Sequence, residues 1–464
     1  MSTAVQGKIN QANLVKYLIT FGLPAVIYLL PRSEIYTREM AIVIAATFCF
    51  LAWAAFELTN LFVPTILWPC VLILTHAVTY TDVYGAYTGS TIPGVAGVLV
   101  LATTLERIGL LKRMAFWVAQ KFGGSYVGAV YSVFAATLTI TLVTFACGDV
   151  IAAAITYGAV KAFHLEKTPA GAVIMMAGML GGITMRLVVY SPFFLNPMVE
   201  VVRSINPEFT ISQFDTLLYN WPVLIFCIAF IWLMIKLFVN KESVANLNSK
   251  TYYHDEYAKL GKMSNAEKVG AVILLFIMLS IFTYEIHSLE FMYAFVIGMA
   301  VMYLFGYATN DDILGCPLSL LFFFASCMAI GSVCGAVGIT TLLTNTLTPI
   351  LALMGKSGVL VATLLFGFIV NFCMTPVAMC AGLSGMVYEL VTSAGLAPMA
   401  GLMTFYHSTD LVLLPYEFIS FLLFFAYGVM STKDFVKLHA LKCVCFILFY
   451  GVIFIPYWSL LGLI

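Results

Sequence analysis

Uninterrupted apolar stretches of about 20 residues recur along this chain of 464 residues, and they constrain its fold more than any other feature. A helix of that length spans the hydrocarbon core of a bilayer. Only 9% of the residues are charged, whereas soluble domains carry roughly 25%. The stretches lack the alternation of β-barrel strands, so we predict an all-α polytopic membrane protein. The clearest stretches are Met40–Glu57, Asn60–Val78, Trp221–Asn240, Lys268–Tyr284, Phe291–Tyr307 and Leu441–Ile464.

Net charge and cysteine usage exclude several classes of function. The formal net charge is zero, which gives no case for a nucleic-acid partner. The 11 cysteines are scattered, mostly within apolar stretches, and form no CxxC pattern or Cys/His cluster. We therefore expect packed thiols and no metal site.

Basic residues predict the topology. Lys8 and Lys16 flank the first predicted span, Tyr17–Leu30, so the N-terminus is expected in the cytoplasm. This orientation places 17 of the 22 Lys and Arg residues inside and yields about 11 spans, in the plasma membrane or, in a bacterium, the inner membrane. The 241–267 segment reads as a solvated linker. The expected cytoplasmic connections are Arg107–Lys121, Lys161–Lys167, Lys236–Lys268 and Lys433–Lys442.

Two apolar segments are predicted to enter the membrane and return on the same side. Residues 126–163 could cross twice, yet basic residues flank both ends and must stay inside. This segment is expected to be a re-entrant hairpin from the cytoplasmic side, with its tip at Ala146–Asp149. Residues 359–388 are expected to form a second hairpin from the external side, with its tip at Phe372–Pro376. Irregular backbone at membrane depth is tolerated only where it is buried or lines a cavity.

The two halves of the chain form a predicted inverted repeat. In each half a lead-in helix precedes the hairpin, and a proline and a helix broken by polar residues follow it. The lead-in is basic in the first half only, which indicates opposite orientations. Paired broken segments of this kind point to a transport site at the bilayer midplane. The predicted divisions are an N-terminal span (1–37), repeat one (38–240), a cytoplasmic linker (241–267) and repeat two (268–464).

The order and spacing of these motifs resemble the divalent anion:sodium symporter family of the ion transporter superfamily. The similarity runs over roughly residues 40–440 and lies in pattern more than in identity. It implies a homodimer with a fixed scaffold and a mobile domain that moves like an elevator. The motifs that carry it are WAAFELTNLFVP (53–64), LERIGLLKRMA (105–115), GMLGGITMRLVVYSPFFLNP (178–197) and FYHSTDLVLLPYEF (405–418).

The hairpin tips depart from the family pattern. Family members carry Ser-Asn-Thr motifs that hold substrate carboxylate and help to form sodium sites. Here the first tip reads Cys147-Gly148-Asp149 and the second reads Cys373-Met374-Thr375, in which only Thr375 matches. Thiols and thioethers are poor ligands for a hard cation, although backbone carbonyls at broken helices can replace them. No cofactor is expected, and Na⁺ remains a candidate coupling ion.

Four ionisable residues are predicted at membrane depth, where a charge costs roughly 2.5–3.5 kcal/mol on insertion scales. Arg186 lies 39 residues after Cys147, and Asp410 lies 37 after Cys373, at near-equivalent points of the repeats. A planar guanidinium suits a substrate carboxylate, but Arg186 could instead form a structural pair with Asp149 or Asp410. Asp149, His407 and Asp410 are candidates for coupling-ion transfer, although His407 could simply be hydrogen-bonded packing.

Hydroxyl groups near these charges complete the predicted site. Their alternative role is to bond carbonyls of their own helix. The candidate substrate-binding residues are Cys147, Gly148, Asp149, Arg186, Ser191, Met374, Thr375, Ser408 and Thr409.

The sequence therefore predicts a secondary transporter of small divalent anions, di- or tricarboxylates, coupled to sodium or protons. A sodium-independent dicarboxylate exchanger is the alternative. A channel suits paired re-entrant tips less well than alternating access does. An intramembrane aspartyl protease would need a GxGD pattern, but residue 146 is alanine, and HExxH and GxSxG motifs are absent. We expect no enzyme.

Overall fold

The computed structural model describes residues 11–464, apart from residues 57, 89–90, 123, 241, 245–249, 288, 290, 316–317 and 373. Helices account for all the regular secondary structure in the described residues, so the predicted all-α fold is confirmed. By length and composition, four helical segments of the described chain qualify as membrane spans, among them Tyr126–Thr144, Pro169–Val188 and Thr432–Leu460. A fifth qualifies if Gln213–Asn220 and Pro222–Phe238, bent by 45°, form one span. The count of 11 spans stays a prediction.

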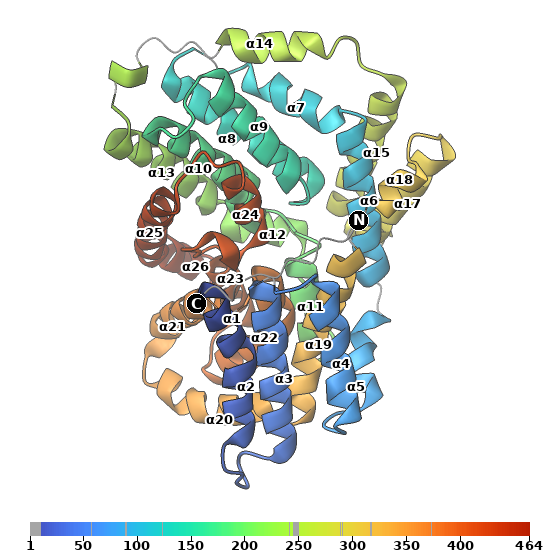
Figure 1. The fold of residues 1–464 in the computed structure, drawn as a ribbon, viewed down its shortest axis with the longest axis vertical. Helices are drawn as coiled ribbons and strands as arrows, with labels where there is room; N and C mark the ends of the chain where they lie inside the picture. The colour runs from blue at the N-terminus through green and yellow to red at the C-terminus, as the bar shows by residue number, and fades with distance from the viewer. Residues whose placement is uncertain are drawn as a thin grey trace.

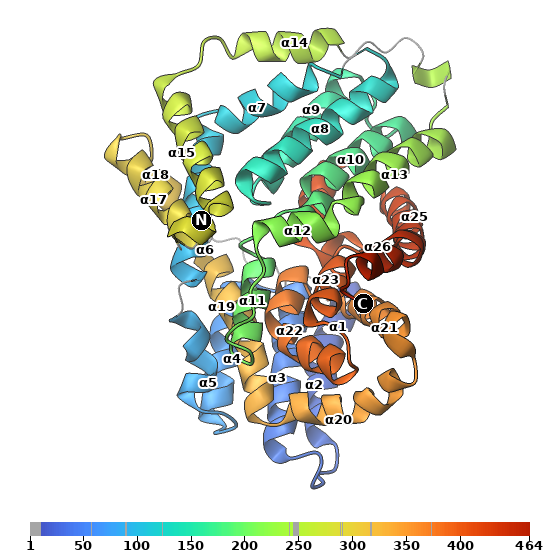
Figure 2. The ribbon, with the colours of Figure 1, turned by 180° about the vertical axis from the view of Figure 1, so that it is seen from behind.

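Figures 1 and 2 show how the principal helices are arranged. In the first half of the chain they are α1 (Gln11–Tyr17), α2 (Leu23–Leu29), α3 (Arg38–Ala55), α4 (Phe62–Leu74), α5 (Tyr80–Tyr84), α6 (Thr91–Arg107), α7 (Leu110–Ala119), α8 (Tyr126–Thr144), α9 (Asp149–Ala162), α10 (Pro169–Gly182), α11 (Leu195–Arg203), α12 (Gln213–Asn220) and α13 (Pro222–Phe238). In the second half they are α14 (Lys250–Lys259), α15 (Asn265–Phe282), α17 (Phe291–Leu304), α18 (Asn310–Leu314), α19 (Leu318–Ala336), α20 (Ile339–Ala352), α21 (Gly355–Val370), α22 (Pro376–Ser393), α23 (Pro398–Ser408), α24 (Ile419–Phe425), α25 (Thr432–Phe449) and α26 (Ile455–Leu460).

The two predicted hairpins are helical pairs that lie toward opposite ends of the long axis. Figure 1 shows α8 and α9 in the upper part beside α7, α10 and α14, and α21 and α22 in the lower part beside α20. Figure 1 shows helices α23 to α26 between these groups, and Figure 2 shows α23, α25 and α26 there from behind. The chain turns between α8 and α9 at residues 145–148, and between the end of α21 at Val370 and the start of α22 at Pro376. Their entry into a membrane from opposite sides stays a prediction.

Capping residues explain where several of these helices begin. Ser125 and Thr168 each accept a hydrogen bond from the backbone N–H three residues on, which satisfies a free amide at the starts of α8 and α10. Pro169 then occupies the first turn of α10, where the missing N–H costs nothing. Such local signals fix helix starts inside an apolar chain.

The linker between the repeats keeps a solvent-exposed face, as expected, but one side of it is docked on the bundle. Tyr253 of α14 is completely buried, and its hydroxyl donates to the carbonyl of Ala129. Arg113 of α7 donates to both carboxylate oxygens of Glu267 at 2.7 and 3.2 Å, and to the carbonyls of Leu260 and Gly261. The Arg113 side chain therefore fixes the end of α14 to the start of α15.

We expect this anchor to weaken in acid. Burial by itself would raise the pKa of Glu267, but hydrogen bonds from Arg113 and Ser264 outweigh it and hold the pKa below the ordinary value of 4.5. The stabilisation is thus complete above pH 4.5 and is lost as the pH falls through the lower, folded-state pKa. Hydrogen exchange over residues 250–259, corrected for intrinsic rates, should then accelerate. Glu267→Gln should show the faster exchange already at pH 7, and equal protection at pH 7 would contradict the anchor.

Close packing of α10 against α8 requires a glycine. A Cβ atom at Gly181 would lie 2.4 Å from the carbonyl oxygen of Phe134 and 2.9 Å from the amide of Leu138, both backbone atoms of α8. Backbone atoms cannot rotate away as a side chain can. The helices can therefore approach this closely only where α10 has no side chain.

Gly181→Ala should destabilise the protein by about 1–3 kcal/mol through overpacking. Thermal unfolding in detergent would measure the change. Gly331→Ala is the matched control, because it gains the same helix propensity while its Cβ would make only ordinary contacts at 3.5 Å or more. A melting temperature of Gly181→Ala equal to or above that of Gly331→Ala would disprove the close contact.

Lys442 was expected in a cytoplasmic connection, Lys433–Lys442, and this expectation is wrong. Helix α25 begins at Thr432, because Ser431 and Asp434 form a capping box there. Lys442 lies ten residues further on, or about 15 Å along the helix. Its side chain is only 1% exposed. The lysine therefore belongs to the interior of the bundle.

Candidate functional site

The two broken helices meet in the middle of the molecule. Helix α10 ends at Gly182 and continues as a short 3₁₀ turn, Thr184–Val188, while α23 ends at Ser408 and continues as irregular chain to Pro415. The residues predicted at equivalent points of the repeats, Arg186 and Asp410, lie in these two breaks. They form an ion pair across 224 residues of sequence.

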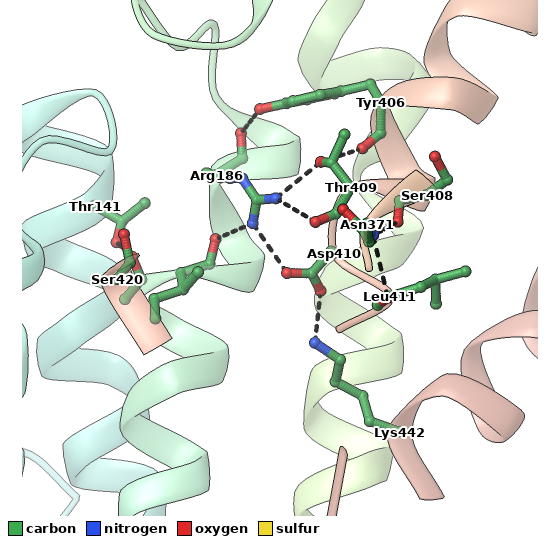
Figure 3. A network of polar contacts seen from close by, with 12 residues as sticks. Thr141, Arg186, Asn371, Tyr406, Ser408, Thr409, Asp410, Leu411, Ser420 and Lys442 are labelled. Carbon is green, nitrogen blue, oxygen red and sulfur yellow. Dashed lines mark hydrogen bonds and ion pairs between the residues drawn. The ribbon is translucent and has the colours of Figure 1, made fainter. Parts of the chain in front are cut away.

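Arg186 is bound almost entirely by the second break (Figure 3). Its Nη1 donates to Asp410 Oδ1 at 2.9 Å and to the carbonyl of Ile183 at 3.3 Å. Its Nη2 donates to the hydroxyl and the carbonyl of Thr409 at 2.8 and 3.1 Å. The Tyr406 hydroxyl donates to the Arg186 carbonyl at 2.8 Å. The predicted pairing with an acid thus exists, and the acid is Asp410 rather than Asp149.

Aromatic rings enclose the guanidinium. The Arg186 Cζ lies 4.8 Å from the ring centre of Phe194 and 5.0 Å from that of Phe418, which are cation–π distances. Only 1% of the Arg186 side chain is exposed. The cavity of about 570 Å³ found between α11, α19 and α22 is lined by other residues. Any ligand of Arg186 must therefore enter through a conformational change.

Lys442 adds a second buried cation to the pair. Its Nζ donates to Asp410 Oδ2 at 2.9 Å, so each oxygen of the carboxylate faces one cation. The Lys442 Nζ also lies 5.1 Å from the ring centre of Phe421. We call Arg186, Asp410 and Lys442 the ion triad, and its formal charge is +1.

One residue of each hairpin binds the end of the neighbouring broken helix. The Thr141 hydroxyl oxygen of α8 lies 2.9 Å from each of the last two carbonyl oxygens of α10, so its single O–H shares its hydrogen bond between them or with the Thr137 carbonyl at 3.1 Å. The Asn371 amide, just after α21, donates to the carbonyls of Ser408 and Leu411 at 2.7 and 3.1 Å. Carbonyls at a helix end lose their regular helical amide partners, and although the Ser408 carbonyl also accepts from the Leu411 amide at 3.0 Å, the side chains that bind these ends stabilise the breaks.

The first hairpin tip has an unusual backbone. Phe145 and Ala146 both adopt left-handed conformations, with φ of 51° and 65°, which non-glycine residues rarely do. A Cβ atom at Gly148 would lie 2.3 Å from a methyl group of Ile140. Cys147 is half-buried in the turn. Strained backbone of this kind is typical of functional sites.

Asp149 occupies the first turn of α9, where the helix dipole favours a negative charge. It accepts a hydrogen bond from the hydroxyl of Ser420 on α24. The first tip is thereby joined to the segment that follows the second break. The hydrogen-bond partner of Asp149 is thus Ser420 and not Arg186.

The remaining predicted residues are placed less directly. Thr375 caps α22 by accepting from the amide of Ala378, and Met374 is buried beside it. Cys373 lies outside the described residues. Ser191 is buried, and its hydroxyl accepts from the amide of Phe193 at 3.4 Å. The structure thus brings Arg186 together with Thr409 and Asp410. Thr375 and Ser191 form hydrogen bonds with other groups.

His407 is also held by protein groups. Its Nε2 lies 2.9 Å from the Asn220 side-chain oxygen, and the rings of Phe454 and Trp458 pack around it at 4.6 and 5.6 Å. The hydrogen-bonded packing considered from the sequence is therefore present. Ser408 similarly donates to the carbonyl of Phe405 within its own helix at 2.6 Å.

Sequence reasoning missed Lys442, Asn371 and Ser420. The capping box at Ser431 was the available signal for Lys442, because a helix starting there carries the lysine deep into an apolar span. The signal for Asn371 was an amide within an otherwise apolar hairpin arm. Chemically, the assembled site is a desolvated cationic centre between two helix breaks, suited to a small anion.

Comparison with known proteins identifies relatives of the chain. A family model described as "Sodium:sulfate symporter transmembrane region" matches residues 11–464. Among solved structures, the YdaH transporter of Alcanivorax borkumensis is similar in fold, with a TM-score of 0.52, 13% sequence identity and coverage of 97% of each chain. No curated protein matches this sequence.

Proposed function

The chain belongs to the sodium:sulfate symporter family, the divalent anion:sodium symporter family that its sequence resembles, and on this premise we propose that it carries di- or tricarboxylates. It is a membrane-embedded secondary transporter of anions and not an enzyme. The proposal concerns the substrate class, the coupling and the mechanism. It includes an elevator movement, a homodimer and location in a plasma membrane with the N-terminus inside.

The observation that carries the proposal is the buried Arg186 in the break after α10. A desolvated guanidinium binds carboxylate more strongly than in water, and its planar fork matches two carboxylate oxygens. The neighbouring Thr409 hydroxyl accepts from Arg186 Nη2 at 2.8 Å and donates to the Tyr406 carbonyl at 2.7 Å, so it would have to turn its O–H away from Tyr406 to bind the same anion. The formal charge of +1 on the ion triad favours an anion over a cation.

Coupling to sodium or protons is part of the proposal. Asp149, His407 and Asp410 are the groups proposed to take part in ion transfer. Backbone carbonyls at the two breaks are the proposed ligands for Na⁺ in place of the lost tip residues. The alternative is a sodium-independent dicarboxylate exchanger, which is favoured by the thiol and thioether side chains at the tips.

Uptake into proteoliposomes tests these proposals. Radiolabelled succinate, citrate and sulfate would be offered with a sodium gradient, a proton gradient or internal dicarboxylate, each alone. Uptake of succinate or citrate driven by sodium would support a symporter, and uptake driven only by internal anion would support the exchanger. Sulfate uptake without carboxylate uptake would overturn the substrate class.

A further inference from the structure

Lys442 lies where a lysine is costly. It lies about 15 Å along α25 from Thr432, where the helix begins. It belongs to the candidate span Thr432–Leu460 and is 1% exposed. A buried lysine within a candidate span is a functional candidate by default, and its partner identifies the role.

The partner is the carboxylate that also holds Arg186. Lys442 Nζ and Arg186 Nη1 each lie 2.9 Å from a different oxygen of Asp410. Two other acids lie on segments that adjoin the site and have partners of their own: the Glu417 carboxylate accepts from the amides of Leu413 and Leu414, and Asp149 is bound by Ser420. Neither forms an ion pair with Lys442 among the described residues.

A second cation is unnecessary if the pair is only structural. One cation satisfies one buried carboxylate, and an additional buried charge adds a desolvation cost. The arrangement makes sense if Arg186 must leave Asp410 during the transport cycle. With Lys442 in place, Asp410 keeps a counter-ion after the guanidinium has changed partner. Without it, the departure of Arg186 would leave a bare buried carboxylate.

Arg186 retains one donor for an incoming anion. Within the described part of the chain, its Nε–H has no hydrogen-bond partner, although the side chain is buried. Buried donors are normally paired. A substrate carboxylate could contact Nε–H first and then take the Nη1 donor that binds Asp410.

We propose that Lys442 is the counter-ion that releases Arg186 to a substrate carboxylate by retaining Asp410. The inference rests on the proposed function and assigns a positioning role to Lys442. A positive charge at residue 442 is required as long as residue 410 is a carboxylate that competes with the substrate for Arg186. Variants that change the charges at residues 442 and 410 therefore test the role of Lys442.

Three variants test the role: Lys442→Met, Lys442→Arg and the double variant Lys442→Met with Asp410→Asn. Lys442→Met leaves Arg186 in a neutral pair with Asp410, and KM for succinate should rise by about tenfold or more, the scale of close buried charge pairs. The double variant restores the charge of +1, and Lys442→Arg keeps it. Lys442→Arg should have a KM within about threefold of the unaltered protein. The double variant should have a lower KM than Lys442→Met, because its Arg186 no longer pairs with a carboxylate that competes with the substrate.

The outcomes separate this inference from the proposed function. If the unaltered protein takes up no carboxylate, the substrate proposal fails. If the protein is active, an unchanged KM in Lys442→Met overturns the role of Lys442, as does a folded double variant no better than Lys442→Met. If Lys442→Met does not give monodisperse protein, the double variant decides by the same criterion. If neither Lys442→Met nor the double variant folds, Lys442→Arg decides: loss of uptake in a folded Lys442→Arg protein overturns the inference.

Discussion

Arg186→Gln is expected to abolish anion uptake while the protein remains folded in detergent. Glutamine removes the charge and the forked donors, and loss of one partner from a buried charge contact costs about 2–5 kcal/mol, or about 30-fold or more in affinity. Folding should survive, because Asp410 still pairs with Lys442 at 2.9 Å. Initial uptake rates in proteoliposomes and elution profiles in detergent would measure the two effects.

Arg186→Lys serves as the control for charge. It keeps the positive charge but loses the planar fork, so uptake should be weak but above background. Unchanged uptake in Arg186→Gln would remove Arg186 from the substrate site and leave only its structural pairing with Asp410.

Asp410→Asn is expected to be the most destabilising single change in the site. It leaves Arg186 and Lys442 as two buried cations without a carboxylate between them. Breaking a buried ion pair by removing one partner costs about 3–5 kcal/mol. Thermal unfolding in detergent should show a large fall in melting temperature and a poor yield of monodisperse protein.

Thr409→Ala is the matched control for this change. It lies next to Asp410 and removes one hydroxyl bonded to Arg186, at a cost of about 0.5–1.5 kcal/mol. Similar melting temperatures for Asp410→Asn and Thr409→Ala would mean that the triad carries no unusual electrostatic stabilisation.

Much of the site could be anticipated from local sequence. The turn predicted at Ala146–Asp149 lies where the chain reverses between α8 and α9. Arg186 and Asp410 were found by their charge in apolar surroundings and by their equivalent spacing from the two tips. Both are indeed buried, in the breaks after α10 and α23. These features are local, so a pattern in one stretch of chain is sufficient to predict them.

The pairing of these residues could not be anticipated. The sequence left Asp149 and Asp410 as equal partners for Arg186, because both are acids expected at similar depth. The structure selects Asp410 through contacts across 224 residues. Lys442 was placed in a loop because basic residues at span ends usually face the cytoplasm. The cap at Ser431 instead starts the helix earlier and carries the lysine inward.

The sequence by itself determined that this protein is an all-helical membrane transporter with two broken, paired segments. The helical fold follows because a backbone in lipid must satisfy its own hydrogen bonds, and long apolar stretches without alternation do this as helices. The transport function follows from the order and inverted pairing of the broken segments. Tertiary structure alone decided which charges meet, which tip binds Ser420 and where the linker docks. These choices depend on the relative placement of helices far apart in the chain, and a buried charge is stable only where that placement supplies its partner.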